Sequence, residues 1–121
     1  MLMGNNRVKS YVAQGAVQPR RFVKFGASDT QVVQAVTADT NIVIGISDLI
    51  GATDTARCEV FVGDHADVEF GGNVARGQAV KADASGRAIL AAAGEAFCGI
   101  SMVTAVAGDI ASVRIDRGTA T

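Results

Sequence analysis

The sequence contains no tryptophan, one tyrosine and five phenylalanines, so large aromatic side chains can contribute little to a core. Its apolar residues are mainly alanine and valine, and these bury little area per residue, at about 25 cal/mol per Å². A chain of 121 residues is long enough to fold as one domain. Because the core must be built from small side chains, we expect part of the stabilisation to come from association with further copies or with a partner.

Long apolar runs are also absent. Residues 1–10 lack the apolar segment of a signal peptide, and the longest uncharged run, residues 96–108, is too short for a bilayer and contains glycines. We therefore expect no membrane partner and synthesis in a cytoplasm, where Cys58 and Cys98 stay reduced. Both cysteines alternate with apolar neighbours, which predicts two buried free thiols rather than a disulfide.

Catalytic and metal-binding patterns are missing. The one histidine, His65, lies near Asp64, Asp67 and Glu69, but this spacing matches no calcium loop. A single imidazole without a thiolate or a second histidine is a poor zinc site, so solvated loop residues are the simpler interpretation. The sequence has no Gly-x-Ser-x-Gly and no Gly-rich phosphate loop ending in Lys-Ser/Thr. We expect no enzyme, no cofactor and no catalytic, cofactor-binding or metal-binding residue.

Acidic residues are missing from the N-terminal segment. The first 24 residues carry five basic side chains and no acidic one, whereas the remainder carries six basic and twelve acidic residues. Nucleic acid binding would require denser basic runs interleaved with aromatic residues, so we expect no nucleic acid partner. A basic segment beside an acidic body favours a protein contact instead. The candidate partner-binding residues in this segment are Arg7, Lys9, Tyr11, Arg20 and Arg21.

The same segment shows no sustained helical or strand periodicity and holds the only proline, Pro19. A segment that cannot bury enough apolar surface becomes ordered only against another molecule. The sequence therefore predicts an extended N-terminal arm over residues 1–21 and a folded domain over residues 22–121.

An internal duplication is visible in the remainder. Gly45-Ile46-Ser47 recurs 54 residues later as Gly99-Ile100-Ser101. Upstream the offset is 57 residues, so three extra residues of the first copy are expected in the loop 37–44. The upstream matches are Val23-Lys24, Ala27-Ser28 and Val32-Val33 with Val80-Lys81, Ala84-Ser85 and Ile89-Leu90. Solenoids and propellers need three or more repeats, so two copies predict one compact barrel or sandwich.

Short β-rich runs separated by turn residues fill both copies. Residues 59–70 alternate between apolar and charged side chains, and Gly26 to Asp29 and Asp83 to Gly86 suit hairpins. Residues 87–93 alone favour a helix, but their counterpart, residues 31–36, is β-branched and favours a strand. We therefore predict strands throughout: an all-β fold of eight to ten strands, as a small β-barrel or β-sandwich.

The sequence resembles the phage head decoration proteins, also called capsid cement proteins, over roughly residues 11–116. The resemblance is carried by Ile44-Gly45-Ile46-Ser47, by the run from Gly72 to Ala88, by Cys98-Gly99-Ile100-Ser101 and by Ala107-Gly108-Asp109. The Gly-Gln-x-Val-x-x-Asp-x-x-Gly-Arg stretch, residues 77–87, is its most specific part.

This resemblance implies a small β-barrel-like protein without catalytic activity that assembles, often as a homotrimer, on the outer surface of a tailed-phage head. There it would bridge neighbouring subunits of the major capsid protein and stabilise the shell, so the expected location is the virion. The alternative is a non-enzymatic β-barrel binding module that recognises a small ligand, a peptide or a host-surface molecule. No catalytic motif accompanies the resemblance, and the partner-binding residues named above rest on charge and composition alone.

Overall fold

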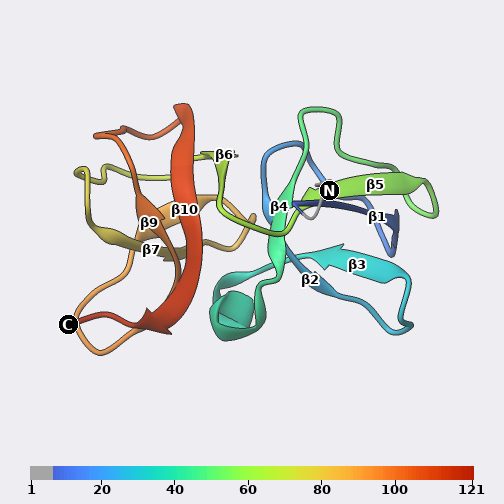
Figure 1. The fold of residues 1–121 in the computed structure, drawn as a ribbon, viewed down its shortest axis with the longest axis horizontal. Helices are drawn as coiled ribbons and strands as arrows, with labels where there is room; N and C mark the ends of the chain where they lie inside the picture. The colour runs from blue at the N-terminus through green and yellow to red at the C-terminus, as the bar shows by residue number, and fades with distance from the viewer. Residues whose placement is uncertain (1–6) are drawn as a thin grey trace, which may run out of the picture.

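The computed structural model describes residues 7–121, and these residues form mainly short β-strands and turns. Figure 1 shows two groups of strands lying side by side. The first is a closed barrel in the order β1-β3-β2-β4-β5, and the second is a five-stranded sheet in the order β6-β10-β9-β7-β8. The predicted all-β fold is therefore confirmed. The strands are β1 (Val8–Ala13), β2 (Phe22–Phe25), β3 (Gln31–Gln34), β4 (Gly45–Ser47), β5 (Arg57–Phe61), β6 (His65–Glu69), β7 (Ala79–Ala82), β8 (Ala88–Leu90), β9 (Ala96–Ser101) and β10 (Ile110–Thr119).

The same pairing scheme occurs in both groups. β2 pairs antiparallel with β3 and β4, as β7 pairs with β8 and β9. β5 pairs antiparallel with β4 and β1, as β10 pairs with β9 and β6. β1 lies parallel to β3, and a parallel bridge between Phe70 and Ala88 brings the end of β6 to β8. The predicted duplication is confirmed, and we call residues 8–62 copy 1 and residues 65–119 copy 2.

Isolated bridges outside the strands repeat as well. Val17 and Ala52 exchange two backbone hydrogen bonds of 2.8 Å, and Val74 and Ala105 exchange two of 2.9 Å. Residues 37–44, where the offsets predicted three extra residues, contain the 3₁₀ helix η1 (Thr37–Ile42), the one helix in residues 7–121. The inserted residues are therefore accommodated in η1, outside the strands that the two copies share.

The glycine of the repeated Gly-Ile-Ser sequence permits close strand packing. A Cβ on Gly45 would collide with the carbonyl oxygen of Phe61 in β5. A Cβ on Gly99 would lie 3.2 Å from the carbonyl oxygen of Arg114 in β10, which is tighter than an ordinary contact. In both copies, glycine therefore lets the central strand approach the strand that follows it.

The serine of the same sequence is buried in both copies. The hydroxyl of Ser47 donates to the carbonyl oxygen of Gln18 at 2.7 Å, and that of Ser101 donates to the carbonyl oxygen of Val103 at 2.5 Å. Because each buried hydroxyl has an acceptor, its desolvation is compensated.

The extended arm predicted over residues 1–21 is wrong for residues 8–21; residues 1–6 lie outside the described part of the chain. β1 pairs with β5 from Val8 to Val12 and lies parallel to β3, so it is part of the closed barrel. Tyr11 and Ala13 point into the core while the residues between and beside them are more exposed. Because β1 is paired on both sides, two inward side chains are enough to hold it in the barrel. The folded domain therefore begins at residue 8 rather than 22.

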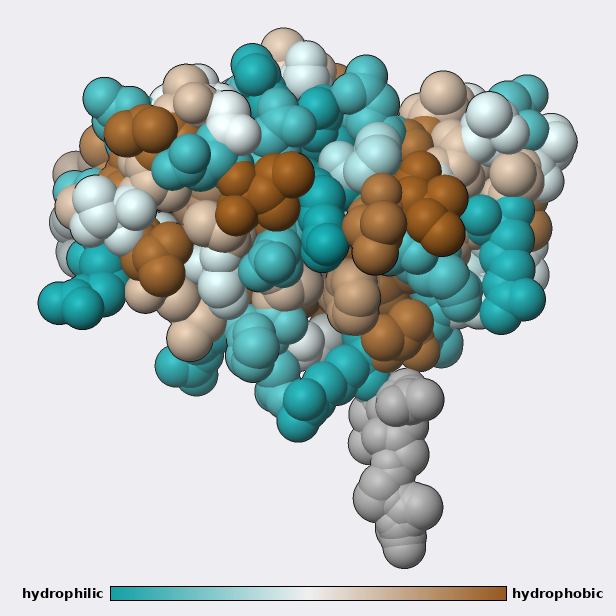
Figure 2. Space-filling view, turned by 90° about the horizontal axis from the view of Figure 1, so that it is seen from above, coloured by the Kyte–Doolittle hydropathy of each residue, from teal (hydrophilic) through white to brown (hydrophobic). Residues whose placement is uncertain are grey.

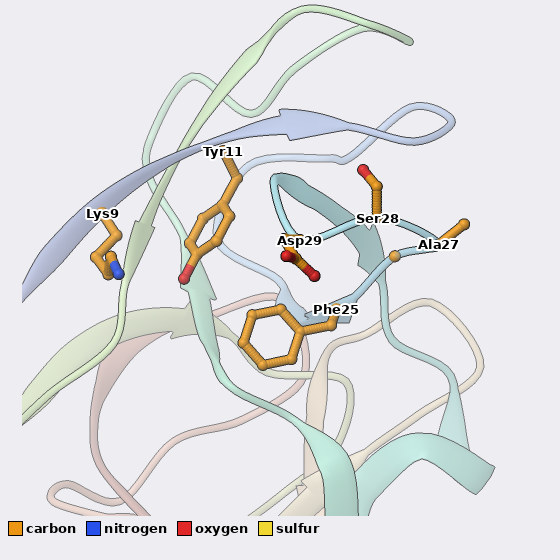
Figure 3. A pocket seen from close by; sticks show the side chains of 7 residues that line it. Lys9, Tyr11, Phe25, Ala27, Ser28 and Asp29 are labelled. Atoms are coloured by element: carbon orange, nitrogen blue, oxygen red, sulfur yellow. The ribbon is translucent and has the colours of Figure 1, made fainter.

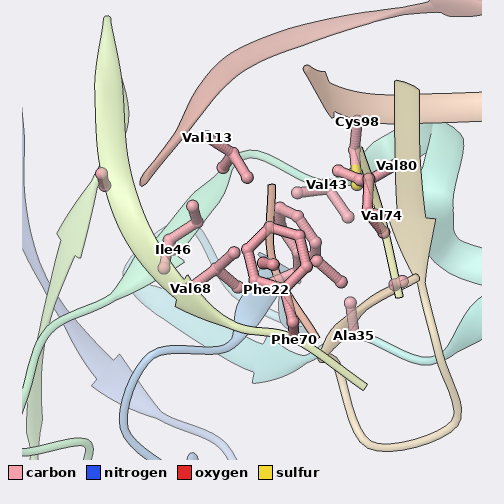
Figure 4. Packing of buried hydrophobic residues seen from close by; sticks show 14 residues of the cluster. Phe22, Ala35, Val43, Ile46, Val68, Phe70, Val74, Val80, Cys98 and Val113 are labelled. Carbon is pink, nitrogen blue, oxygen red and sulfur yellow. The ribbon is translucent and has the colours of Figure 1, made fainter. Parts of the chain in front are cut away.

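The two copies share the larger of two hydrophobic clusters. Figure 4 shows Phe22 of β2 beside Phe70, which follows β6, and both side chains are fully buried. A smaller cluster, which includes Tyr11, Val32 and Val60, fills the barrel of copy 1. Because residues of both copies meet in the larger cluster, separating the copies would expose apolar surface on each. The labelled members of the larger cluster are Phe22, Ala35, Val43, Ile46, Val68, Phe70, Val74, Val80, Cys98 and Val113.

Candidate interaction surfaces

Groups that could carry chemistry are dispersed. Within residues 7–121, no three His, Cys, Asp or Glu side chains lie close enough together to hold a metal ion. His65, expected in a solvated loop, lies on β6 and is exposed there. In the same range no helix is long and apolar enough to cross a bilayer.

Both cysteines are buried free thiols, as predicted. Burial raises the pKa of Cys58 to about 11, and the nearby carboxylates of Asp48 and Glu59 add to this effect. Burial also raises the pKa of Cys98 to about 12, against weaker opposing hydrogen bonds from the backbone. A thiol is a nucleophile only as the thiolate, so neither side chain is activated at neutral pH.

Arg7 and Lys9, two of the candidate partner-binding residues, are exposed. Arg7 forms an ion pair with Asp64, its Nε lying 2.7 Å from Oδ2, and more than half of each side chain is exposed to solvent. Such an exposed pair contributes little stability, so Arg7 could exchange Asp64 for another carboxylate at small cost. Lys9 lies on β1 beside the groove described below.

Arg20 and Arg21 lie in the turn that enters β2. Arg20 is half-buried and has a left-handed backbone with φ of 59°. The side chain of Arg21 is only 9% exposed and bridges the two copies. Its Nη2 lies 3.2 Å from Oε1 of Glu69, and its Nη1 donates to the carbonyl oxygen of Ser85 at 3.0 Å. Arg21 is therefore an internal link rather than a residue presented to a partner.

Tyr11 is mostly buried and forms one wall of an open groove of about 450 Å³. Figure 3 shows its ring facing that of Phe25, with Lys9 on one side and Asp29 near the β2–β3 turn. The two rings meet edge to face, with centroids 6.1 Å apart and an interplanar angle of 70°. This groove combines an aromatic pair with a cation and a carboxylate, a set that could hold a small amphipathic group.

Two loops present apolar side chains to solvent, and we call them tip 1 (residues 49–52) and tip 2 (residues 102–106). Leu49 and Ile50 of tip 1 are 67% and 75% exposed. Met102, Val103 and Val106 of tip 2 are 45%, 40% and 51% exposed. Exposure of single apolar residues is ordinary, but here consecutive or nearby apolar residues are exposed at the end of a loop.

The tips lie on one face of the molecule. In Figure 1 the chain between β4 and β5 and the chain between β9 and β10 both reach the upper edge. Figure 2, which is seen from above, shows apolar side chains exposed over both halves of this face. The face therefore carries two apolar elements with polar side chains between them.

The tips were not predicted from the sequence. Tip 2 lies within the uncharged run of residues 96–108, which was considered only as a possible membrane span, and no site was predicted over residues 49–52. The available signal was the two apolar pairs in turns after the repeated Gly-Ile-Ser sequence, Leu49-Ile50 and Met102-Val103, because turns normally carry polar residues.

No protein-family model and no curated protein matches the sequence. The family resemblance described above is thus not confirmed at the sequence level. Among solved structures, the fold is similar to the N base of the head fiber gp8.5 of bacteriophage phi29, with a TM-score of 0.73 and 15% sequence identity. The match covers 94% of this chain and 97% of that one. At this identity the similarity establishes the fold, and it includes both copies rather than one.

Proposed function

We propose that this chain is a capsid decoration protein that binds the outer surface of a tailed-phage head and stabilises it by bridging neighbouring major capsid protein subunits. The observation that carries the proposal is the fold similarity to the phi29 head fiber base over nearly the whole length of both chains. The resemblance of the sequence to phage head decoration proteins, which rests on motifs and not on the fold, also supports a location on the phage head.

The proposed role is structural and not enzymatic. The two cysteines, the strongest potential nucleophiles of the chain, are buried with raised pKa values, which supports this assignment. Exposed apolar loops on a folded β-body suit a protein that acts through contact area. The exposed cations Arg7 and Lys9 are further candidate contacts for acidic groups on the shell.

We further propose that the protein acts as a homotrimer. The core consists largely of alanine and valine, and exposed apolar side chains such as Phe25 (56%) and Leu90 (44%) remain for contacts between copies. A symmetric ring would place several weak shell contacts together, which multiplies their effect.

A second candidate function is a binding module for a small ligand or peptide. The groove between Tyr11 and Phe25 favours it, because an aromatic pair beside Lys9 and Asp29 offers both stacking and charged contacts. In that case Phe25→Ala would abolish ligand binding, and the parent protein itself would not attach to phage heads.

Co-sedimentation with undecorated heads of the phage that encodes the chain tests the proposal. We expect the purified protein to sediment with the heads, to saturate, and to raise the temperature at which the heads rupture. The binding-module alternative predicts no sedimentation with heads at any concentration. Light scattering of the free and the released protein tests the trimer.

A further inference from the structure

Tip 1 and tip 2 are equivalent positions of the duplicated chain. Both follow the strand that carries Gly-Ile-Ser: β4 ends at Ser47, with Asp48 before tip 1, and β9 ends at Ser101, directly before tip 2. Each includes the equivalent backbone bridge residue, which is Ala52 at the end of tip 1 and Ala105, one residue before the end of tip 2. The two sequences, Leu-Ile-Gly-Ala and Met-Val-Thr-Ala-Val, share apolar character rather than identity.

Tip 1 is held in shape by its own hydrogen bonds. The carboxylate of Asp48 accepts from the backbone N–H groups of Ile50 and Gly51, at 2.9 and 3.1 Å. Gly51 has φ of 68°, and a Cβ there would meet the backbone of residues 17–19. Ile50 also borders an open, mainly apolar groove of about 490 Å³ that includes Val17 and Pro19.

Tip 2 is fixed by different bonds with the same effect. Ser101 donates its hydroxyl to the carbonyl oxygen of Val103, and the N–H of Val106 donates to Oδ2 of Asp109 at 3.0 Å. The N–H of Arg76 reaches the hydroxyl of Thr104 at 3.3 Å. Residues 49–52 and 102–106 contain no charged side chain, and Asp48, directly before tip 1, uses its carboxylate to accept the N–H groups of Ile50 and Gly51. Loops that are already ordered lose little conformational entropy when they bind.

We propose that the two tips are paired docking sites on two neighbouring, identical subunits of the phage shell. Each subunit carries one copy of an apolar socket, and each tip inserts its apolar side chains into one of them. This inference rests on the proposed function and identifies the face through which it operates. A partner with two copies of one socket is favoured because the chain presents one apolar element twice, on a single face, from equivalent positions. A shell of repeated subunits offers such a pair of sockets.

The chemistry of the tips defines the sockets as apolar and uncharged. Burying Leu49 and Ile50 in one socket and Met102 and Val103 in the next removes apolar surface from water without any ion pair. Attachment through the tips is therefore expected to change little with ionic strength, unlike attachment through Arg7 and Lys9. When two weak contacts act together, loss of one lowers the apparent affinity far more than its own contact area suggests.

The test compares three variants and one matched control in co-sedimentation with undecorated heads. The variants are Leu49→Ser with Ile50→Ser, Met102→Ser with Val103→Ser, and all four together. The control, Val36→Ser with Ile42→Ser, changes two side chains that are 45% and 50% exposed. These lie at η1, at the lower edge of Figure 1 and away from the tips. Thermal melts of every protein confirm that it is folded.

We expect each double variant to bind heads at least about tenfold more weakly, the quadruple variant at least about a hundredfold more weakly, and the control as the parent does. If wild-type protein binds the heads and either double variant binds equally well, paired docking is wrong while the decoration role stands. If the wild-type protein itself does not bind, the decoration role fails, and the docking proposal fails with it.

Discussion

Arg21 of copy 1 and Glu69 of copy 2 form an ion pair, with Nη2 3.2 Å from Oε1, where the two halves of the molecule meet. Their side chains are 9% and 26% exposed, so this pair is far better shielded from solvent than that of Arg7 with Asp64. Two neighbouring backbone bonds also cross the junction, from the N–H of Phe22 to the carbonyl oxygen of Gly86 and from the N–H of Glu69 to that of Arg20. Arg21 therefore helps to fix one copy against the other.

Replacing Arg21 should destabilise the fold strongly. Arg21→Ala leaves Glu69 partly buried, with only Arg87 nearby at 3.8 Å, so we expect the free energy of unfolding to fall by about 3 kcal/mol. Arg7→Ala removes an exposed pair and should cost less than about 1 kcal/mol. Urea unfolding of both variants gives the comparison. Equal effects of the two changes would refute the assignment of Arg21 as a link between the copies.

The glycines of the repeated sequence should differ in their tolerance of alanine. Gly45→Ala pushes a methyl group into the carbonyl oxygen of Phe61, so β4 and β5 must separate, and we expect a loss above about 3 kcal/mol. Gly99→Ala brings a methyl group 3.2 Å from the carbonyl oxygen of Arg114, which a small shift relieves, and should cost about 1 kcal/mol. Thermal melts rank the two variants, and the reverse order would contradict the packing described for β4.

Stability should fall in alkaline solution because of the buried thiols. The pKa of Cys98 is about 12 in the folded state, raised by burial from an ordinary value of 9.0. Below pH 9 the thiol of Cys98 keeps its proton in both the folded and the unfolded chain, so it does not change the free energy of unfolding with pH. Between about pH 9 and 12 the unfolded chain releases a proton that the folded chain keeps, so stability decreases as pH rises, by up to about 1.4 kcal/mol per pH unit.

The variant Cys98→Ala isolates this effect. It lacks the thiol, so its free energy of unfolding should decline less steeply than that of the parent above pH 9, although it starts from a lower value. Comparison of the two slopes cancels the groups that both proteins share. Parallel slopes from pH 8 to 11 would show that Cys98 is not protected from ionisation by burial.

The sequence predicted much of the strand arrangement because the duplication constrained it. Residues 87–93 have helical propensity, yet they contain strand β8, as the alignment with copy 1 required. The hairpins between β2 and β3 and between β7 and β8 were found for the same reason. Two copies of one pattern are stronger evidence than either copy alone.

Strand β1 and the role of Arg21 could not be found in this way. In β1 only Tyr11 and Ala13 turn inward, and five basic residues within 24 positions suggested a solvated arm. The partner of Arg21 lies 48 residues away in sequence, so only tertiary packing brings its guanidinium to Glu69. The apolar tips were hidden because exposure depends on what covers a loop, which no local pattern records.

Deletion of residues 1–10 distinguishes a detached N-terminal arm from the paired strand β1. If residues 1–10 formed a detached arm, their removal would leave the body folded. In the structure, Val8 to Ser10 pair with residues 59–61 of β5, so deletion of residues 1–10 should remove half of β1 and lower the melting temperature markedly. Circular dichroism melts measure this, and an unchanged melting temperature would support the detached arm instead.

The most direct test of the decoration role is electron cryomicroscopy of heads with and without the bound protein. For each bound copy of the chain we expect a two-lobed density on the outer surface of the shell, with residues 49–52 and 102–106 facing two neighbouring capsid subunits. The lobes should match the two groups of strands in Figure 1. Heads that show no added density at saturating protein, or density only at the tail, would contradict the account.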